Sequence, residues 1–209
     1  NHPTVARNQI ETLSTCRWIL DFHFILLQGP PGVSKTHLAV ALSTRALENG
    51  FSVSFYHVDE WMHQLKGDGQ LHPSQLKHRK YMASNLLVLD EFGYQSMNRE
   101  EANLFFRVVS YRYQKGSTII TTNKGIGSWP EVLAGDELLA GDILDRLLHS
   151  ATVLNIQGRS YRLKELEASI DHRPIARERR CRVRASPHRK RSRVASYLDS
   201  LSLTDIASS

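Results

Sequence analysis

A short loop rich in glycine and proline constrains this chain more than any other feature. Residues 29–36 read GPPGVSKT. They follow an apolar run at residues 22–28, which has the length of a buried strand, and they lead into residues 35–48, whose apolar positions recur at helical spacing. A strand, a glycine-rich turn and a helix in this order direct backbone N–H groups and the positive end of the helix at an anion. The sequence therefore predicts a phosphate-binding loop.

The loop follows the pattern G-x-x-x-x-G-K-[ST] at three of its four fixed positions. Gly29, Lys35 and Thr36 match, whereas Ser34 stands where glycine is expected. Lys35 is predicted to neutralise the outer phosphates of ATP, and the Thr36 hydroxyl to ligate Mg²⁺. A side chain at position 34 crowds the phosphates, so we expect it to affect hydrolysis more than binding. The predicted nucleotide-binding residues are Gly29, Pro30, Pro31, Gly32, Val33, Ser34, Lys35, Thr36 and His37.

Strands and helices alternate along the first three quarters of the chain. This alternation predicts an α/β fold, in which a parallel sheet forms the middle of three layers and helices cover both faces. Further strands are predicted at residues 51–57, 86–89, 117–122 and 152–156, and further helices at residues 5–18, 99–113 and 142–149.

Two acids, Asp90 and Glu91, directly follow the apolar residues 86–89 and lie 55 and 56 positions after Lys35. Burying an unpaired charge is unfavourable, so charges at the end of a buried strand indicate a function. Asp90 is predicted to hold Mg²⁺, directly or through water, and Glu91 to orient and polarise the attacking water. The alternative is a strand that simply exits into solvent.

Two further polar residues are candidates for the catalytic set. Asn123 ends the strand at residues 117–122 and is predicted to contact the γ-phosphate, although asparagine is also a common turn residue after a strand. Arg146 lies in the helix at residues 142–149 and is a candidate arginine finger for a neighbouring subunit. An ordinary surface arginine, paired with Asp142 or Asp145, is the simpler interpretation of its spacing alone.

Charge is concentrated near the C-terminus of the 209-residue chain. Residues 173–193 hold ten arginines and lysines against one acid, whereas the whole chain carries a net charge of +6, so the remainder is net acidic. Such a block is typical of a disordered arm that binds polyanions, and an unselected sequence has the same appearance. Two distant cysteines, no membrane-length apolar run and no signal peptide favour the cytoplasm. Because the chain begins with Asn1, we also consider it a fragment of a longer protein.

Four runs of the sequence together resemble the IstB family, the helper ATPases of bacterial insertion sequences, which are related to the DnaC helicase loader. The runs are GPPGVSKTHLAVAL, LLVLDEFGY, STIITTN and GDILDRLLHSATVLNIQGRSYRLKE. The resemblance implies an AAA+ core without the usual C-terminal helical lid, at residues 1–166. The basic tail at residues 167–209 departs from the family and is expected from its composition alone. It implies ATP and Mg²⁺ as cofactors, assembly on double-stranded DNA, and a transposase as partner.

The same resemblance assigns roles to single residues. Lys35 and Thr36 fall on the Walker A motif, Asp90 and Glu91 on Walker B, Asn123 on sensor 1 and Arg146 on the arginine-finger position, which implies self-association through the ATPase interface. Two other functions stay open: a loader of a replicative helicase, and a nucleotide-gated DNA-binding module with little turnover, which Ser34 favours. His57, Asp59 and His63 are close in sequence but lack a known metal-ligand spacing.

Overall fold

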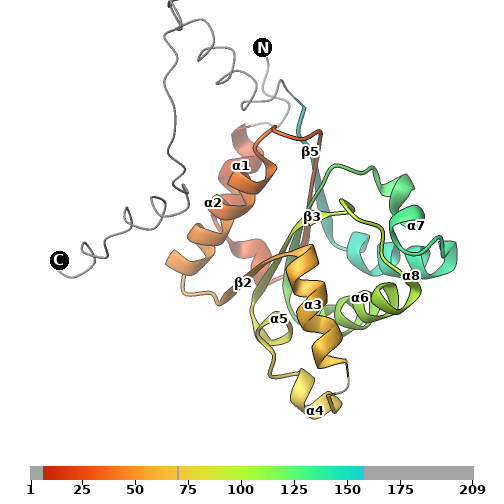
Figure 1. Ribbon diagram of the computed structural model, residues 1–209. Helices are drawn as coiled ribbons and strands as arrows, with labels where there is room; N and C mark the ends of the chain where they lie inside the picture. The colour runs from red at the N-terminus through yellow and green to blue at the C-terminus, as the bar shows by residue number, and fades with distance from the viewer. Residues whose placement is uncertain (1–6, 70, 158–209) are drawn as a thin grey trace, which may run out of the picture. The chain divides into compact units, whose positions relative to one another are not determined.

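A five-stranded parallel sheet forms the centre of the computed structural model, which describes residues 7–69 and 71–157 (Figure 1). The strand order is β2-β3-β4-β1-β5. The strands are β1 (Phe24–Gln28), β2 (Val53–His57), β3 (Leu86–Phe92), β4 (Ser117–Thr122) and β5 (Ala151–Asn155). Every neighbouring pair runs parallel, so the carboxyl ends of all five strands lie at one edge of the sheet.

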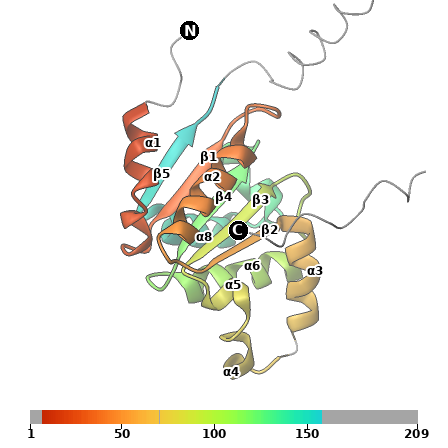
Figure 2. The same ribbon diagram turned by 90° about the vertical axis from the view of Figure 1, so that its left-hand side faces the viewer.

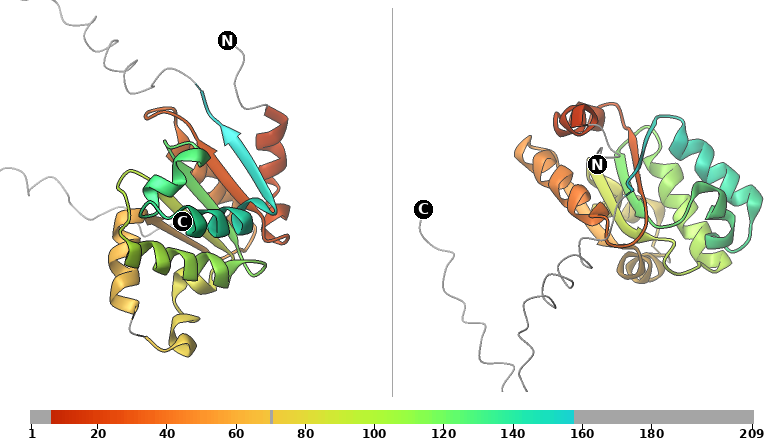
Figure 3. Two further views of the ribbon diagram at one scale, coloured as in Figure 1. Left: turned by 90° about the vertical axis from the view of Figure 1, so that its right-hand side faces the viewer. Right: turned by 90° about the horizontal axis from the view of Figure 1, so that it is seen from above.

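Helices cover both faces of this sheet, as the view from above shows (Figure 3). The helices are α1 (Arg7–Ser14), α2 (Lys35–Glu48), α3 (Val58–Asp68), α4 (Pro73–Leu76), α5 (Lys80–Ala83), α6 (Arg99–Arg112), α7 (Trp129–Val132) and α8 (Glu137–Leu148), with 3-10 turns η1 (Arg17–Ile19) and η2 (Ile126–Ser128). Helices α1 and α2 lie on one face, and α6, α7 and α8 on the other (Figures 2 and 3). The three-layer α/β architecture predicted from the sequence is thereby confirmed.

The side chains of the strands contribute alternately to two hydrophobic cores, one on each face of the sheet. In β1, Ile25 and Leu27 pack toward α1 and α2, whereas Phe24 and Leu26 pack toward α3, α6 and α8. Because successive side chains of a strand point to opposite faces, a strand covered on both sides is apolar at every position. This is why residues 24–27 of β1 are apolar at every position. Trp61 and Trp129 are fully buried in the core that Phe24 and Leu26 share with α3, α6 and α8, as expected for packing residues.

The buried side chain of Arg112 binds the backbone at the beginnings of β3 and β4. The guanidinium of Arg112, at the end of α6, donates to the Ser84 carbonyl oxygen at 2.9 Å, just before β3, and to the Ser117 carbonyl oxygen at 2.7 Å in β4. Burial lowers the pKa of Arg112 to about 10, which leaves it charged at neutral pH. Carbonyl oxygens compensate its lost hydration. Arg112 thereby fixes one end of β3 and β4, whose other ends carry the candidate site residues.

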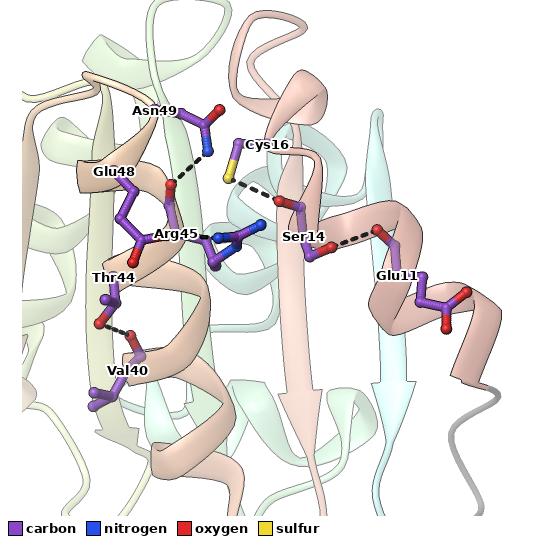
Figure 4. A network of polar contacts seen from close by, with 8 residues as sticks. All are labelled: Glu11, Ser14, Cys16, Val40, Thr44, Arg45, Glu48 and Asn49. Atoms are coloured by element: carbon purple, nitrogen blue, oxygen red, sulfur yellow. Dashed lines mark hydrogen bonds and ion pairs between the residues drawn. The ribbon is translucent and has the colours of Figure 1, made fainter.

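Helix α1 rests against α2 mainly through apolar side chains. Leu13 and Cys16 belong to the same buried cluster as the inner face of α2. The hydrogen bonds drawn in Figure 4 stay within each segment: Ser14 donates to the Glu11 carbonyl oxygen at 2.7 Å, and Arg45 binds a side chain three residues further along α2. The contact between the two helices is therefore one of packing.

The predicted elements agree closely with the observed ones where the pattern was strong. The helix at residues 35–48 and the strand at residues 117–122 have the predicted bounds. The predicted strand at residues 86–89 continues to Phe92, and the helix predicted to begin at residue 142 begins at Glu137. It begins there because the Asp136 carboxylate caps it, accepting from the Leu139 N–H at 3.0 Å.

Some predictions fall outside the described part of the chain. The basic block at residues 173–193, the tail at residues 167–209 and the question of a C-terminal lid all lie beyond residue 157. Within residues 7–69 and 71–157, no helix has both the length and the apolar character needed to cross a bilayer.

Candidate functional site

A pocket of about 450 Å³ lies at the carboxyl edge of the sheet. The phosphate loop, the beginning of α2 and the segments that follow β3 and β4 form its walls. Its lining residues are Pro31, Gly32, Ser34, Lys35, Thr36, His37, Glu91, Tyr94, Thr121, Thr122 and Asn123. In open parallel sheets the carboxyl edge is where ligands bind. Residues from three distant parts of the sequence are thus brought together around one cavity.

The beginning of the phosphate loop is held close to the backbone of neighbouring strands. The Gly29 N–H donates to the Thr122 carbonyl oxygen at 3.2 Å, and the Ile156 N–H donates to the Gln28 carbonyl oxygen at 2.7 Å. A Cβ atom at Gly29 would collide with the Ile156 carbonyl oxygen. Glycine is therefore required here by the close approach of the segment that follows β5, which anchors the loop to the sheet.

Ser34 immediately precedes α2 and adopts a left-handed backbone, with φ of 68° and ψ of 26°. This conformation suits glycine and is unfavourable for other residues by roughly 1–2 kcal/mol. The Ser34 side chain also makes no capping hydrogen bond to the helix, although serine is a common cap. The loop thus keeps a backbone shape suited to glycine at the position where the motif expects one.

Lys35 folds back over the loop that it follows. Its ammonium donates to the carbonyl oxygens of Gly29 and Pro30, both at 2.8 Å. Burial lowers the pKa of Lys35 from its usual value, and the nearby charges of Asp90 and Glu91 oppose that shift. The amine thus lies inside the pocket wall, held by carbonyl groups that a phosphate oxygen can replace as a partner.

Asp90 lies beneath the pocket and is completely buried. Both of its carboxylate oxygens accept from the Thr36 hydroxyl, each at 3.1 Å, and the Thr121 hydroxyl donates to Oδ1. These contacts join the first turn of α2, β3 and β4. A buried carboxylate is tolerated only when it is well hydrogen-bonded or binds a cation. Thr36 and Asp90, predicted as the metal-binding pair, are therefore in direct contact.

Glu91 and Asn123 occupy the rim of the same pocket. Glu91 has a left-handed backbone, with φ of 64°, at the point where the register between β3 and β4 shifts. Its N–H donates to Thr121 Oγ1 at 3.0 Å, and its side chain is exposed. Asn123 directly follows β4 and is exposed as well. Both side chains are thus available to a ligand.

Three residues of the predicted nucleotide-binding set do not line the cavity: Gly29, Pro30 and Val33. Gly29 and Pro30 contribute the carbonyl groups that hold Lys35. Val33 is buried, with 5% of its surface exposed. These residues shape the loop, whereas Ser34, Lys35, Thr36 and His37 face the cavity.

Arg146 lies away from this pocket in its own chain. Its guanidinium donates to the Asp142 carbonyl oxygen at 2.7 Å and stacks on the Phe106 ring, 4.8 Å from the centroid. It lines a second hollow together with His23 and Ser150, at the amino ends of the strands. Arg146 is half-buried, and its backbone contact replaces the side-chain pairing with Asp142 or Asp145 considered above. Any role at a nucleotide would have to be played toward another subunit.

Sequence reasoning missed Thr121, and it grouped His57 with Asp59 and His63, whereas the structure places it beside Asp90 and Glu91. Thr121 bridges the Asp90 side chain and the Glu91 backbone. His57 ends β2, and its Nδ1 atom lies 3.8 Å from Asp90 Oδ2. Both depend on the strand order, which places β2 and β4 on either side of β3. For Thr121, a threonine inside a buried strand was the available signal.

Comparison with known proteins identifies the family of the chain. The profile of a family described as IstB-like ATP binding protein matches residues 2–169. An insertion sequence IS21 protein of Pseudomonas aeruginosa, named for ATP binding, is 44% identical over 163 residues, which cover 78% of this chain and 61% of that protein. The chain thus spans about three fifths of the length of this relative.

Solved structures with the same fold include replication proteins. A crystal structure of the DnaC helicase loader has a TM-score of 0.60 and 24% identity, over 75% of this chain and 94% of that one. AMPPCP-bound DnaA from Aquifex aeolicus has a TM-score of 0.57 and 16% identity, over 80% of this chain and 52% of that one. These likenesses show a P-loop AAA+ fold. With the family match, they establish that the chain belongs to the family of IstB-like ATP-binding proteins of insertion sequences.

Proposed function

We propose that the chain binds ATP with Mg²⁺ at the pocket beside residues 29–36 and hydrolyses it slowly, as an oligomer on DNA that assists a transposase in the bacterial cytoplasm. The observation that carries this proposal is the contact of the Thr36 hydroxyl with both oxygens of the buried Asp90 carboxylate, at 3.1 Å. It places a hydroxyl and a carboxylate, the ligands that Mg²⁺ prefers, next to a phosphate loop.

The donor set fits a hard divalent cation. Asp90 carries a fully buried negative charge, and its recorded hydrogen-bond donors are the neutral hydroxyls of Thr36 and Thr121. When bound, Mg²⁺ would neutralise charge on the β- and γ-phosphates. Thr36 and Asp90 would hold it, Asp90 directly or through water. Thr121 would keep the Asp90 carboxylate in place.

The remaining pocket residues have separate roles in this proposal. Lys35 exchanges the carbonyl oxygens of Gly29 and Pro30 for phosphate oxygens, which its charge attracts more strongly. Glu91 accepts a hydrogen bond from the attacking water and polarises it. Asn123 donates its amide to the γ-phosphate. The backbone N–H groups of the loop complete the anion site at the beginning of α2.

DNA and partner contacts are proposed on other surfaces. Residues 77–80, which read KHRK, follow α4 and lead into α5, and all four are exposed. Basic side chains of this kind bind phosphate backbones without sequence preference. The insertion-sequence relative supports a transposase as partner. The left-handed backbone of Ser34 supports the second candidate, a nucleotide-gated DNA-binding module with little turnover.

Replacing the loop lysine tests the proposed nucleotide site. Lys35→Ala should weaken ATP–Mg²⁺ binding by about tenfold or more, because it removes charge-assisted hydrogen bonds worth roughly 1.5–3 kcal/mol. Isothermal calorimetry on the purified protein measures this effect. Lys115→Ala, which removes a lysine on the Tyr111 ring, is the matched control and should bind ATP like the wild type. Equal affinity in all three proteins, or no binding at all, would show the assignment to be wrong.

Restoring glycine at position 34 tests whether the loop limits hydrolysis. Ser34→Gly should raise kcat on the order of tenfold, or about 1.4 kcal/mol of barrier, while ATP affinity stays nearly unchanged. The reason is that a left-handed residue with a Cβ resists the close approach needed in the transition state. Steady-state kinetics with saturating DNA measure it. Ser34→Ala keeps the Cβ and should stay slow, whereas equal turnover in all three would remove the case for a slow enzyme.

Complementation tests whether Arg146 acts on a neighbouring subunit. Mixing Arg146→Ala with Lys35→Ala protein should restore part of the ATPase activity, because some interfaces then combine an intact phosphate loop with an intact arginine. Steady-state ATPase assays with DNA measure the recovery. The control replaces Arg146→Ala by Arg107→Ala, which changes an exposed arginine of α6, in the same mixture with Lys35→Ala protein. It gives the ATPase activity expected when Arg146 is intact in every subunit. The absence of rescue, together with a monomer in sedimentation with ATP and DNA, would contradict a shared site.

A further inference from the structure

A histidine and two acids converge where β2 and β3 end. His57 and Asp90 are register partners in the parallel ladder, and Glu91 follows Asp90. One nitrogen or oxygen atom of each of the three side chains lies within 4.8 Å of the others. Within residues 7–69 and 71–157, this is the one group of three such side chains close enough to hold a metal ion. Its members come from β2 and β3, and Glu91 also lines the pocket beside residues 29–36.

The distance from His57 to Asp90 is informative. His57 Nδ1 lies 3.8 Å from Asp90 Oδ2, which is too long for a hydrogen bond. Metal–nitrogen and metal–oxygen bonds of roughly 2.0–2.2 Å place two ligands of one ion at most about 4.4 Å apart. The observed separation therefore fits an ion between the two atoms. Glu91 is exposed and can complete the set by a small side-chain movement.

The neighbouring lysine leaves this position open. The charges of Asp90 and Glu91 act on Lys35 and oppose the lowering of its pKa by burial. Its ammonium nevertheless donates to the carbonyl oxygens of Gly29 and Pro30, both at 2.8 Å. The half-exposed imidazole of His57 faces the buried carboxylate from the other strand. A cation reaching the site thus meets two carboxylate groups and one imidazole nitrogen.

We propose that His57, Asp90 and Glu91 form a divalent metal site that is filled without nucleotide and prefers a transition metal such as Mn²⁺ to Mg²⁺. Mg²⁺ favours all-oxygen ligands, whereas an imidazole nitrogen strengthens the binding of first-row transition metals. The site shares Asp90 with the proposed ATP–Mg²⁺ site and so rests partly on that proposal. His57 then determines which metal the pocket holds before ATP arrives.

Manganese binding to the nucleotide-free full chain tests the site, measured by the loss of the free Mn²⁺ signal in electron paramagnetic resonance. The wild type should bind one Mn²⁺ ion at this site, with Mg²⁺ competing weakly. His57→Ala should weaken Mn²⁺ binding by about tenfold or more. Removing a residue that only supports a metal ligand already weakens metal binding by about this much, and His57 is proposed as a ligand itself. His57→Gln should lower the preference for Mn²⁺ over Mg²⁺, because it replaces nitrogen by an amide oxygen. Circular dichroism would verify that both variants fold.

His63→Ala is the matched control, since His63 is exposed on α3 beside a different small pocket, and it should bind Mn²⁺ like the wild type. Equal Mn²⁺ affinity in the wild type and both His57 variants, or no Mn²⁺ binding by the wild type, would overturn the proposal. Because no nucleotide is present, these outcomes are separate from a failure to bind ATP.

Discussion

The buried carboxylate of Asp90 is the group on which the rest of the site depends. It has no exposed surface, and hydroxyls from the first turn of α2 and from β4 bind it. Leaving such a charge without partners inside a protein is highly unfavourable, so these contacts also hold the three elements together. Thr36 joins it to the phosphate loop, and Thr121 joins it to β4, the strand that Asn123 follows. One charge thereby links the predicted Walker A, Walker B and sensor 1 positions.

The sheet places this charge where a ligand can use it. Arg112 fixes the amino ends of β3 and β4 through backbone carbonyl groups, and the two strands stay paired, with one register shift, to Phe92 and Thr122 at their carboxyl ends. Gly29 brings the loop against the backbone at Ile156, and Ser34 bends it into the beginning of α2 in a conformation suited to glycine. The loop therefore leads into α2 through a left-handed residue, at the single position that departs from the phosphate-loop motif.

Local sequence patterns predicted the layers of the fold and the chemistry of the loop. The order of strand, glycine-rich turn and helix specifies the backbone around Lys35 without reference to distant residues, and the predicted helix at residues 35–48 has its observed bounds. Contacts across strands were not accessible in the same way. Thr121 and His57 meet Asp90 only because β4 and β2 flank β3, and strand order depends on packing of the whole chain. The beginning of α8 at Glu137, before the predicted residue 142, could have been predicted from Asp136, because aspartate is a common helix cap.

The most direct test of this account compares ATP binding with and without Mg²⁺ in the wild type and in Asp90→Asn, by isothermal calorimetry. The substitution keeps the shape of the side chain and removes the charge that is proposed to hold the metal. We predict that both proteins bind ATP alike in the absence of Mg²⁺, and that Mg²⁺ strengthens binding markedly only in the wild type. An equal gain from Mg²⁺ in both proteins would contradict the central role of Asp90.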